Sequence, residues 1–355
     1  MRIITKYLLK KYIKYFLIIL LSLEVFFVGI DLLQNFAKLP ASANLQLLYV
    51  TYNFFYTLTI TLPISLVFGW IVTITMMIKN NELVSFYALS ISPASIIKPI
   101  GAITTVILLL LIFMQSTQLA YSVEQKDKIL NKTLFVNEKS NIFLKYNEYF
   151  VYFKKLYPLE KKAEGIQIFQ TKGNDITKKI DAKKAYYQNN KWYIIDAKIT
   201  KKPQEINWNS SKLEVTYEKF LYTLEGFEPH IINNVYKVKV QFSIIDAIRT
   251  ILLLEDQDFN TNKIKAILYS QLIMPFFVLP LIVLVFIYTN ASSRFFNTAT
   301  YLSATIFATL ITWGVMFLLQ KLSFGNIIMA EFAIILPVAL LFIITSYLYS
   351  KRINL

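Results

Sequence analysis

The chain has 355 residues, 55% of them hydrophobic, with a mean hydropathy of +0.48 and a formal charge of +15. The hydrophobic residues are bunched in long runs, which indicates a membrane protein and excludes an ordinary soluble domain. No cysteine is present, so disulfides, cysteine-ligated metals and thiol catalysis are excluded. A single histidine and the lack of a Walker-type glycine-rich loop predict a chain without metal, cofactor or nucleotide site. Energy from ATP must therefore come from another protein.

Six apolar runs are near or above the roughly 20 residues that a helix needs to cross a bilayer. They cover residues 15–35, 47–78, 100–121, 264–288, 300–320 and 330–349. Four prolines, Pro63, Pro275, Pro280 and Pro337, lie inside these runs, where neighbouring helices can satisfy the released carbonyls. The pattern predicts a bundle of six transmembrane helices, some of them kinked.

Basic residues in the short loops predict the orientation in the membrane. Five of the first 14 residues are Lys or Arg among apolar residues, as expected for a segment lying on an anionic cytoplasmic surface. The two termini and the loops 79–99 and 289–299 hold ten basic residues, and the opposite short loops hold only Lys38 and Lys321. By the positive-inside rule, both termini and the 79–99 loop are cytoplasmic. No nucleic-acid motif accompanies the charge, so we expect no nucleic-acid partner.

The 79–99 loop contains a predicted helix of two to three turns, residues 80–92. Asn80 or Asn81 can cap its N-terminus, Glu82 then lies in the first turn, and Pro93 is expected to stop the helix.

One face of this helix is predicted to need a partner. It carries residues at i, i+3, i+4 and i+7, which are Leu83, Phe86, Tyr87 and Ser90. The face either packs on the neighbouring transmembrane helices or docks a soluble protein, with Glu82 as the ionic contact. A cytoplasmic position favours docking.

The insert between the third and fourth runs, residues 122–262, is predicted to be an all-β domain. Short aromatic and β-branched segments alternate with turns, and Asn189-Asn190 is typical of a tight hairpin. A small sandwich, a jelly roll and an open half-barrel all fit this texture. Ser243-Ile244-Ile245-Asp246 predicts a capped helix that leads back to the membrane. The expected domains are therefore 1–121, with the helix 80–92, then 122–262 and 263–355.

Polar residues near the membrane are candidates for function. Glu24 and Asp31 share a face of the first run, and we expect Glu24 to accept hydrogen bonds from adjacent helices and Asp31 to lie near the outer interface. Lys38 and Lys321 either attract an anionic head group or extend to the interface without a ligand. No nucleophile with an evident base appears, so we expect no catalysis.

Six runs around a β insert, with Asn81-Glu82-Leu83-Val84 leading to Ser90-Ile91-Ser92-Pro93, resemble the YjgP/YjgQ permease family, LptF and LptG. The strand segments 150–153, 165–169 and 191–194 are most similar to LptG. The resemblance implies a jelly-roll-like periplasmic domain and a non-catalytic permease subunit of the ABC transporter that extracts lipopolysaccharide from the inner membrane. It implies a homologous LptF-like half, an LptB-like ATPase dimer and an LptC-like membrane-anchored jelly-roll protein as partners.

The resemblance also assigns roles to residues. It implies that the helix with Glu82, Leu83, Phe86, Tyr87 and Ser90 couples to the ATPase, and that the first and fifth helices form a lateral gate. The candidate lipopolysaccharide contacts are Lys38, Asp31, Gln34 and Lys321, whereas Leu32 and Leu33 stand where a further lysine is expected. The alternative is a non-transporting membrane-anchored scaffold or sensor whose β domain binds a periplasmic partner.

Overall fold

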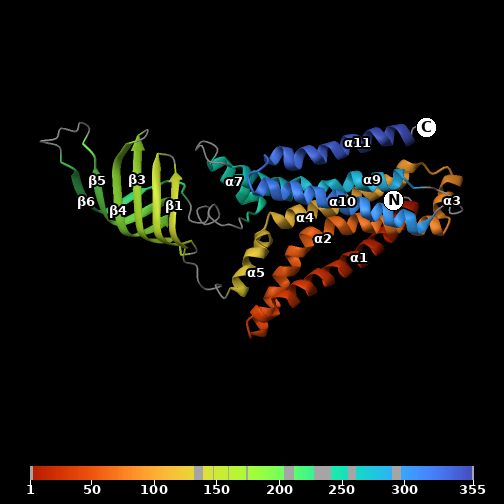
Figure 1. The fold of residues 1–355 in the computed structure, drawn as a ribbon, viewed down its shortest axis with the longest axis horizontal. Coiled ribbons are helices and arrows are strands. Elements are labelled where there is room, and N and C mark those ends of the chain that lie inside the picture. Colours follow the sequence, from red (N-terminus) through yellow and green to blue (C-terminus); the bar gives the residue numbers. More distant parts are fainter. Residues whose placement is uncertain are drawn as a thin grey trace. The chain divides into compact units, whose positions relative to one another are not determined.

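A computed structural model describes residues 3–131, 139–146, 148–158, 160–172, 175–203, 212–227, 241–254, 261–289 and 297–353. The chain divides into two compact units. One comprises Met1–Asn131, Phe242–Ile251 and Asn260–Leu355, and its described part is helical. The other comprises Lys132–Gln241 and Leu252–Phe259 and holds a β-sheet (Figure 1).

The first half of the helical unit runs from the N-terminus to the β insert. Its elements are α1 (Ile3–Asn35), the 3-10 turn η1 (Phe36–Lys38), α2 (Ala43–Lys79), α3 (Glu82–Ala88), α4 (Pro93–Gln115), η2 (Gln118–Tyr121) and α5 (Ser122–Leu130). Helices α1, α2 and α4 are long and apolar enough to cross a bilayer.

The second half follows the insert. Its elements are α7 (Ile244–Leu254), α8 (Asn262–Leu272), η3 (Met274–Phe277), α9 (Val278–Ile287), α10 (Thr298–Phe324), the π-helical turn η5 (Glu331–Ile335) and α11 (Leu336–Ile353). Helix α10 and the segment Glu331–Lys351 are also of spanning length and hydropathy.

The sixth predicted span is a bent pair of helices. Asn262–Leu272 and Met274–Ile287 meet at an angle of 46°. Pro275 lies at the break, where it lacks the N–H that would continue the helical hydrogen bonds and restricts the residue before it. The predicted architecture of apolar helices around a β insert is confirmed. In the described part of the chain, five helices have spanning length and hydropathy, and the total is six when the bent pair is counted as one span.

The prediction that Pro93 ends the helix of the 79–99 loop is wrong. Helix α3 ends at Ala88, Ser90 then has a positive φ of 56°, and Pro93 is the first residue of α4. Proline suits a first helical position because the N–H that it lacks would have no partner there. The short helix is therefore seven residues long, and the third span begins earlier than the predicted residue 100.

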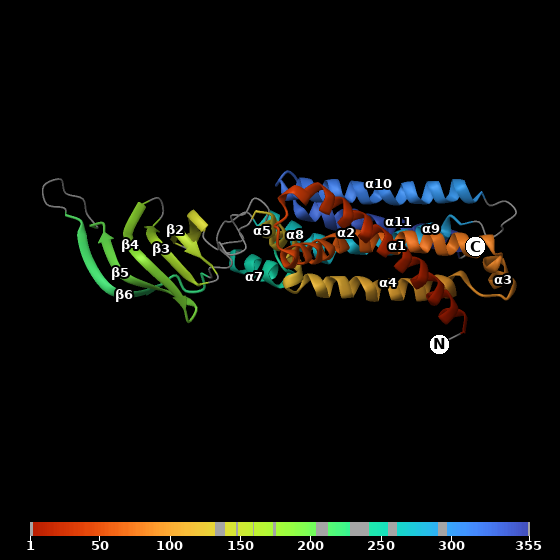
Figure 2. The ribbon, with the colours of Figure 1, turned by 90° about the horizontal axis from the view of Figure 1, so that it is seen from below.

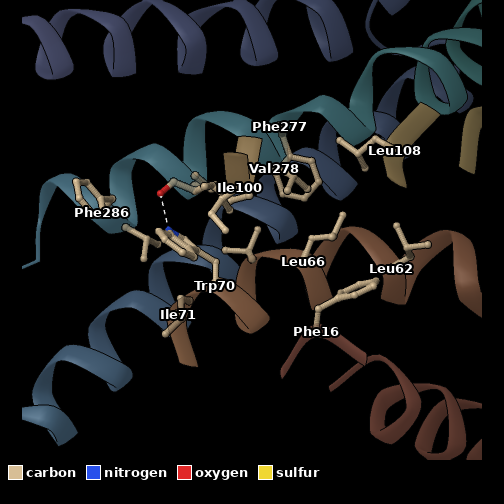
Figure 3. Close-up of a cluster of buried hydrophobic side chains, with 14 of the residues drawn as sticks. Phe16, Leu62, Leu66, Trp70, Ile71, Ile100, Leu108, Phe277, Val278 and Phe286 are labelled. Atoms are coloured by element: carbon tan, nitrogen blue, oxygen red, sulfur yellow. Dashed lines mark hydrogen bonds between the residues drawn. The ribbon is translucent and has the colours of Figure 1, made fainter. Parts of the chain in front are cut away.

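Helix α2 is the centre of the helical core. In its most apolar stretch of 18 residues, 78% of α2 is buried. The corresponding stretches of α1 and α10 are only 11% buried. Trp70 is fully buried, donates its indole N–H to the carbonyl of Ile282 at 3.0 Å and stacks on Phe286 (Figure 3). Since an indole is both large and hydrogen-bonded here, it fixes α2 against α9.

Helix α1 packs on α2 through a small residue. An added Cβ on Gly69 would lie 2.8 Å from the Cα of Phe16, so only glycine allows this close approach. One turn earlier on α1, the buried Tyr12 hydroxyl donates to the carbonyl of Leu66 at 3.1 Å and lies 3.0 Å from the hydroxyl of Thr104 on α4. These contacts attach the first half of α1 to the core.

The β unit is one antiparallel sheet with its described strands in chain order (Figure 2). The strands are β1 (Lys139–Tyr146), β2 (Tyr149–Tyr157), β3 (Lys162–Lys172), β4 (Asp175–Gln188), β5 (Lys191–Lys201) and β6 (Glu214–Thr223). Each strand pairs with the next, as in a meander. A β-sheet in the insert is confirmed, whereas the predicted range 122–262 begins with a helix, α5, that belongs to the helical unit. The six described strands match the open form among the architectures considered, because no crossover of the jelly-roll kind occurs between them.

Two local predictions in and beside the insert are confirmed. Asn189 and Asn190 have φ of 49° and 64° and connect β4 to β5 through the pair Gln188–Lys191, as a two-residue hairpin requires. The backbone N–H of Asp246 donates to the Ser243 hydroxyl at 3.1 Å at the start of α7.

Candidate functional site

Helix α3 is the only short helix between α2 and α4 in the described part of the chain. It lies at the same end of the helical unit as the start of α1 and the end of α11 (Figures 1 and 2). Asn81 occupies the N-cap position with a left-handed φ of 58°, and its side chain makes no capping bond. The Asn80 amide instead donates to Glu82 at 3.1 Å, so the turn points the Glu82 carboxylate toward neighbouring residues.

The predicted apolar face of α3 packs largely on its own bundle. Leu83 is 1% exposed and belongs to the same hydrophobic core as Leu8, Tyr12 and Trp70. Phe86 and Tyr87 are half-buried against that core, and Ser90 is exposed. Burial raises the pKa of Tyr87 above its ordinary value. Three of the four predicted face residues therefore anchor the helix.

Glu82 is held by α1. The Lys11 ammonium donates to both carboxylate oxygens at 2.6 and 2.7 Å, and the two side chains are only 13% and 19% exposed. The Tyr7 hydroxyl, one turn before Lys11, also lies against the carboxylate. A partly buried charge pair with several hydrogen bonds is stronger than an exposed one.

The environment of Glu82 lowers its pKa. Burial by itself would raise the pKa of this carboxyl, but hydrogen bonds from Lys11, Asn80 and Tyr7 and the charge of Lys11 outweigh that effect. The carboxylate is consequently ionised at neutral pH.

The opposite side of α3 faces outward. Val84 and Leu89 are 40% and 71% exposed, and Ser85 and Ala88 beside them are exposed as well. Exposure of these small and apolar side chains to water is unfavourable, and such a surface is typical of an interaction site.

A second polar cluster lies at the other end of α1. The Lys126 ammonium on α5 donates to Asp31 at 2.8 Å and to Asn53 on α2 at 3.0 Å. It lies over the rings of Tyr49 and Tyr56, and the Tyr49 hydroxyl donates to Asp31. Because Lys126 is buried and paired, the cluster joins α1, α2 and α5.

Glu24 lies between these two clusters and is 2% exposed. The hydroxyl of Thr57 on α2 contacts one carboxyl oxygen at 2.7 Å, and the hydroxyl of Thr61 contacts the other. The expectation that Glu24 is hydrogen-bonded by an adjacent helix is confirmed. The Glu24 carboxyl therefore belongs to the α1–α2 interface. Its hydrogen bonds offset the cost of placing a polar side chain inside the membrane.

The candidate lipid contacts do not form one cluster. Gln34 and Lys38 are exposed at the end of α1 and in η1, whereas Asp31 is half-buried in the cluster with Lys126. Lys321, in the last turn of α10, lies over the rings of Phe317 and Phe324. Among the described residues, no hydrogen bond or ion pair joins Lys321 to the other three.

The arrangement of apolar helices, inserted sheet and short helix α3 agrees with a comparison against known families. The family described as lipopolysaccharide export system permease LptF/LptG matches residues 6–351. The chain belongs to the LptF/LptG family. No curated protein gives a significant match. The protein is thus a multi-pass transmembrane permease subunit of the inner membrane, and lipopolysaccharide export is the activity of its family.

Two site residues were missed by the sequence predictions. Lys11 was one of five basic residues near the N-terminus, and the sequence carries no sign that it pairs with Glu82, 71 positions later. Lys126 lies in a short charged helix, where a solvated position is the ordinary expectation. Its burial depends on the aromatic side chains of α2, which only tertiary packing brings to it.

Proposed function

We propose that this chain is one permease half of an ATP-driven ABC transporter that extracts lipopolysaccharide from the inner membrane, and that α3 receives the mechanical work. The observation that supports this most is α3 itself. It is a two-turn helix anchored by a buried leucine, with an apolar side turned outward, in a permease without a nucleotide-binding motif. The natural occupant of that surface is a separate cytoplasmic ATPase, which we take to be an LptB-like dimer.

The coupling element comprises Glu82, Leu83, Phe86, Tyr87 and Ser90 together with the exposed Val84 and Leu89. Leu83, Phe86 and Tyr87 transmit a push on α3 to the core, because they pack directly on it. Val84 and Leu89 supply the docking contact. This division of roles lets a rigid short helix pass force inward.

The orientation that fits this proposal has both termini and α3 in the cytoplasm and the β unit in the periplasm. Basic residues favour it, since they are concentrated in the termini and in the loops on the α3 side. The second permease half is an LptF-like homologue, and the likeness of the strand segments to LptG supports the LptG branch for this chain. The β unit hands the lipid to an LptC-like partner that leads toward the outer membrane.

The lipid path begins beside α1 and α10. Both helices leave most of their apolar surface uncovered, as a gate toward lipid or toward the second half requires. Our candidates for contacts to the head group are Lys38, Gln34 and Asp31 near the end of α1 and Lys321 on α10, because exposed lysines near helix ends attract phosphates. Each methylene moved into water costs about 0.8 kcal/mol, so extraction of several acyl chains needs both ATP and an apolar path.

The test is a charge placed on the outward side of α3. Leu89→Arg should abolish co-purification of the ATPase in mild detergent and stop lipopolysaccharide from reaching the cell surface, while the permease is still inserted in normal amounts. Ile327→Arg is the matched control, because Ile327 is 72% exposed and lies in the connection between α10 and α11. Normal ATPase binding and export by Leu89→Arg would contradict the proposal.

A further inference from the structure

Helix α7 carries an apolar ridge that the described part of the chain does not cover. Ile245 and Ile248 are 47% and 43% exposed and lie one turn apart on the same side, with Arg249 exposed beside them. We propose that this ridge, residues Ile245, Ile248 and Arg249, lies in the surface of the bilayer. Both isoleucines then contact the upper acyl chains, and the guanidinium binds anionic lipid phosphates. The inference goes beyond the proposed function, because it concerns contact with phospholipid and not with the ATPase.

The first argument is the depth at which α7 begins. Helix α4 has 23 residues, so at about 1.5 Å per residue it is about 34 Å long, slightly more than the roughly 30 Å of a hydrocarbon core. Its first residue follows the α3 connection, so Gln115 marks the boundary of the core at the other end of the unit, where α7 lies (Figures 1 and 2). In the turn η2 just beyond Gln115, the Tyr121 hydroxyl donates to Asp246 of α7 at 2.5 Å. The first turn of α7 therefore lies close to this boundary.

The second argument is a contact with another span. The Gln271 side chain donates its amide to the carbonyl of Phe242, directly before α7, at 2.9 Å. Gln271 is near the end of α8, well inside the bent span that begins at Asn262, and Phe242 is fully buried. Two different spans thus hold the start of α7 at the boundary between acyl chains and head groups.

The third argument is the chemistry of the two sides of α7. The inner side packs on the bundle through Ala247 and Thr250, both 0% exposed, and the Thr250 hydroxyl donates to the carbonyl of Asp246 at 2.7 Å. The outer ridge combines two isoleucines with a cation. At a bilayer surface, apolar side chains contact acyl chains while an arginine extends to phosphate. A helix of 11 residues is too short to span the bilayer, so it fits this surface position.

Depth and charge together favour lipid over a protein as the occupant of the ridge. A second protein would have to supply an apolar patch for the isoleucines and a carboxylate for Arg249. The bilayer supplies acyl chains and anionic head groups at the depth that Tyr121 and Gln271 already fix.

Spin labelling tests this position in the full chain, purified with its bound partner proteins. The chain contains no cysteine, so Ile245→Cys and Ile248→Cys each accept one nitroxide. In bilayers of phosphatidylethanolamine and phosphatidylglycerol, we would compare collisions with oxygen, which concentrates among acyl chains, and with a water-soluble nickel complex. The ratio of oxygen to nickel accessibility should be at least about fivefold higher than for Ile176→Cys. Ile176 is the matched control, because it is an isoleucine of β4 that is 51% exposed.

Two results would overturn the placement of the ridge in lipid. Nickel accessibility at positions 245 and 248 equal to that of the control would mean that the ridge faces water. Low accessibility to both reagents, with an immobilised nitroxide spectrum, would mean that a protein covers the ridge instead.

A change of lipid isolates the contribution of Arg249. When phosphatidylglycerol is omitted, the label at position 248 should move outward, and its ratio of oxygen to nickel accessibility should fall about twofold. Adding Arg249→Gln should give the lower ratio in both lipid mixtures. Lys183→Gln is the control, because Lys183 is an exposed cation of β4, and it should keep the dependence on phosphatidylglycerol. A dependence that persists in Arg249→Gln would overturn the contact between the guanidinium and anionic lipid.

These measurements separate the inference from the proposed function. They use neither export nor binding of the ATPase, so water-exposed labels would overturn the ridge while the proposed function stands. Lipid-exposed labels in a chain that binds no ATPase would support the ridge and contradict the proposed function.

Discussion

Helices α1 and α2 lie side by side and are both long and apolar, yet they have opposite surroundings. In its most apolar window α2 is 78% buried, and α1 is 11% buried. Helix α2 is held around most of its circumference, by Trp70 against α9 and by Gly69 against α1. Helix α1 is attached along one stripe only. Helix α2 is therefore the enclosed centre of the helical unit, and α1 lies at its edge with most of its surface uncovered.

The stripe on α1 consists of separate polar and small-residue contacts. From the α3 end to the α5 end they are the pair Lys11–Glu82, the Tyr12 hydroxyl, the Phe16–Gly69 approach, Glu24 with two threonines, and the pair Asp31–Lys126. An ion pair thus lies near each end of the helix. The two pairs differ in their settings, because Lys126 is enclosed by aromatic rings and Asn53, whereas Lys11 pairs with a residue of the short helix α3.

The largest expected effect is the loss of the α2 anchor. Trp70→Ala removes a fully buried indole and its hydrogen bond to Ile282, and should lower the free energy of unfolding by about 3 to 5 kcal/mol. Phe26→Ala on α1 is the matched change, because that ring is 58% exposed, and should cost less than about 1 kcal/mol. Unfolding of both variants in detergent measures the difference, and equal losses would remove the distinction between the two helices.

The next effect concerns the close approach of the two helices. Gly69→Ala places a methyl group 2.8 Å from the backbone of Phe16 and should destabilise the protein by about 2 kcal/mol through overpacking. Gly29→Ala on α1 adds the same methyl group where nothing lies within 4 Å, and alanine favours a helix over glycine by about 1 kcal/mol. Melting temperatures should therefore move in opposite directions, and a decrease for both variants would contradict the packing.

Much of this arrangement follows from the sequence. Apolar run length predicted the spans because the bilayer thickness sets it, and the Asn189-Asn190 hairpin and the Ser243 cap depend on local chemistry alone. The role of Pro93 was mispredicted because a proline both ends one helix and begins another, and only the length of the connection decides.

The site was less predictable than the fold. The apolar pattern of the seven-residue helix α3 predicted that the side with Leu83, Phe86 and Tyr87 needs a partner. That side does have a partner, which is the protein's own core. The pairs of Lys11 with Glu82 and of Lys126 with Asp31 join residues 71 and 95 positions apart, a distance over which local pattern carries no information.

A smaller effect is expected at the α5 end of α1. Lys126→Met keeps the apolar stem but leaves Asp31 without its cation, and should cost about 1.5 kcal/mol of stability. Lys128→Met breaks the neighbouring pair with Glu124 within α5, which should cost only about 0.3 to 0.5 kcal/mol. Chemical unfolding of both variants provides the measurement. Equal costs would mean that the buried cluster does not hold α1 more firmly than a pair within one helix.

The smallest effect is a pH dependence at the α3 end. The pKa of Glu82 in the folded protein lies below its ordinary value of 4.5, so the ion pair contributes fully above pH 4.5 and is lost as the pH falls through the lower folded value. The free energy of unfolding of the original protein should therefore approach that of Glu82→Gln as the pH falls. A difference between the two proteins that grows at low pH would contradict the lowered pKa of Glu82.

We propose that the work of the ATPase enters the permease through the outward side of α3. The most direct measurement is thiol cross-linking from Leu89→Cys in this cysteine-free chain, with identification of the captured protein and its nucleotide binding. We expect capture of a cytoplasmic protein that binds and hydrolyses ATP, with a cross-linking yield that changes when nucleotide is added. Labelling of Leu89→Cys by a membrane-impermeant reagent from the periplasmic side, or capture of no nucleotide-binding protein, would contradict it.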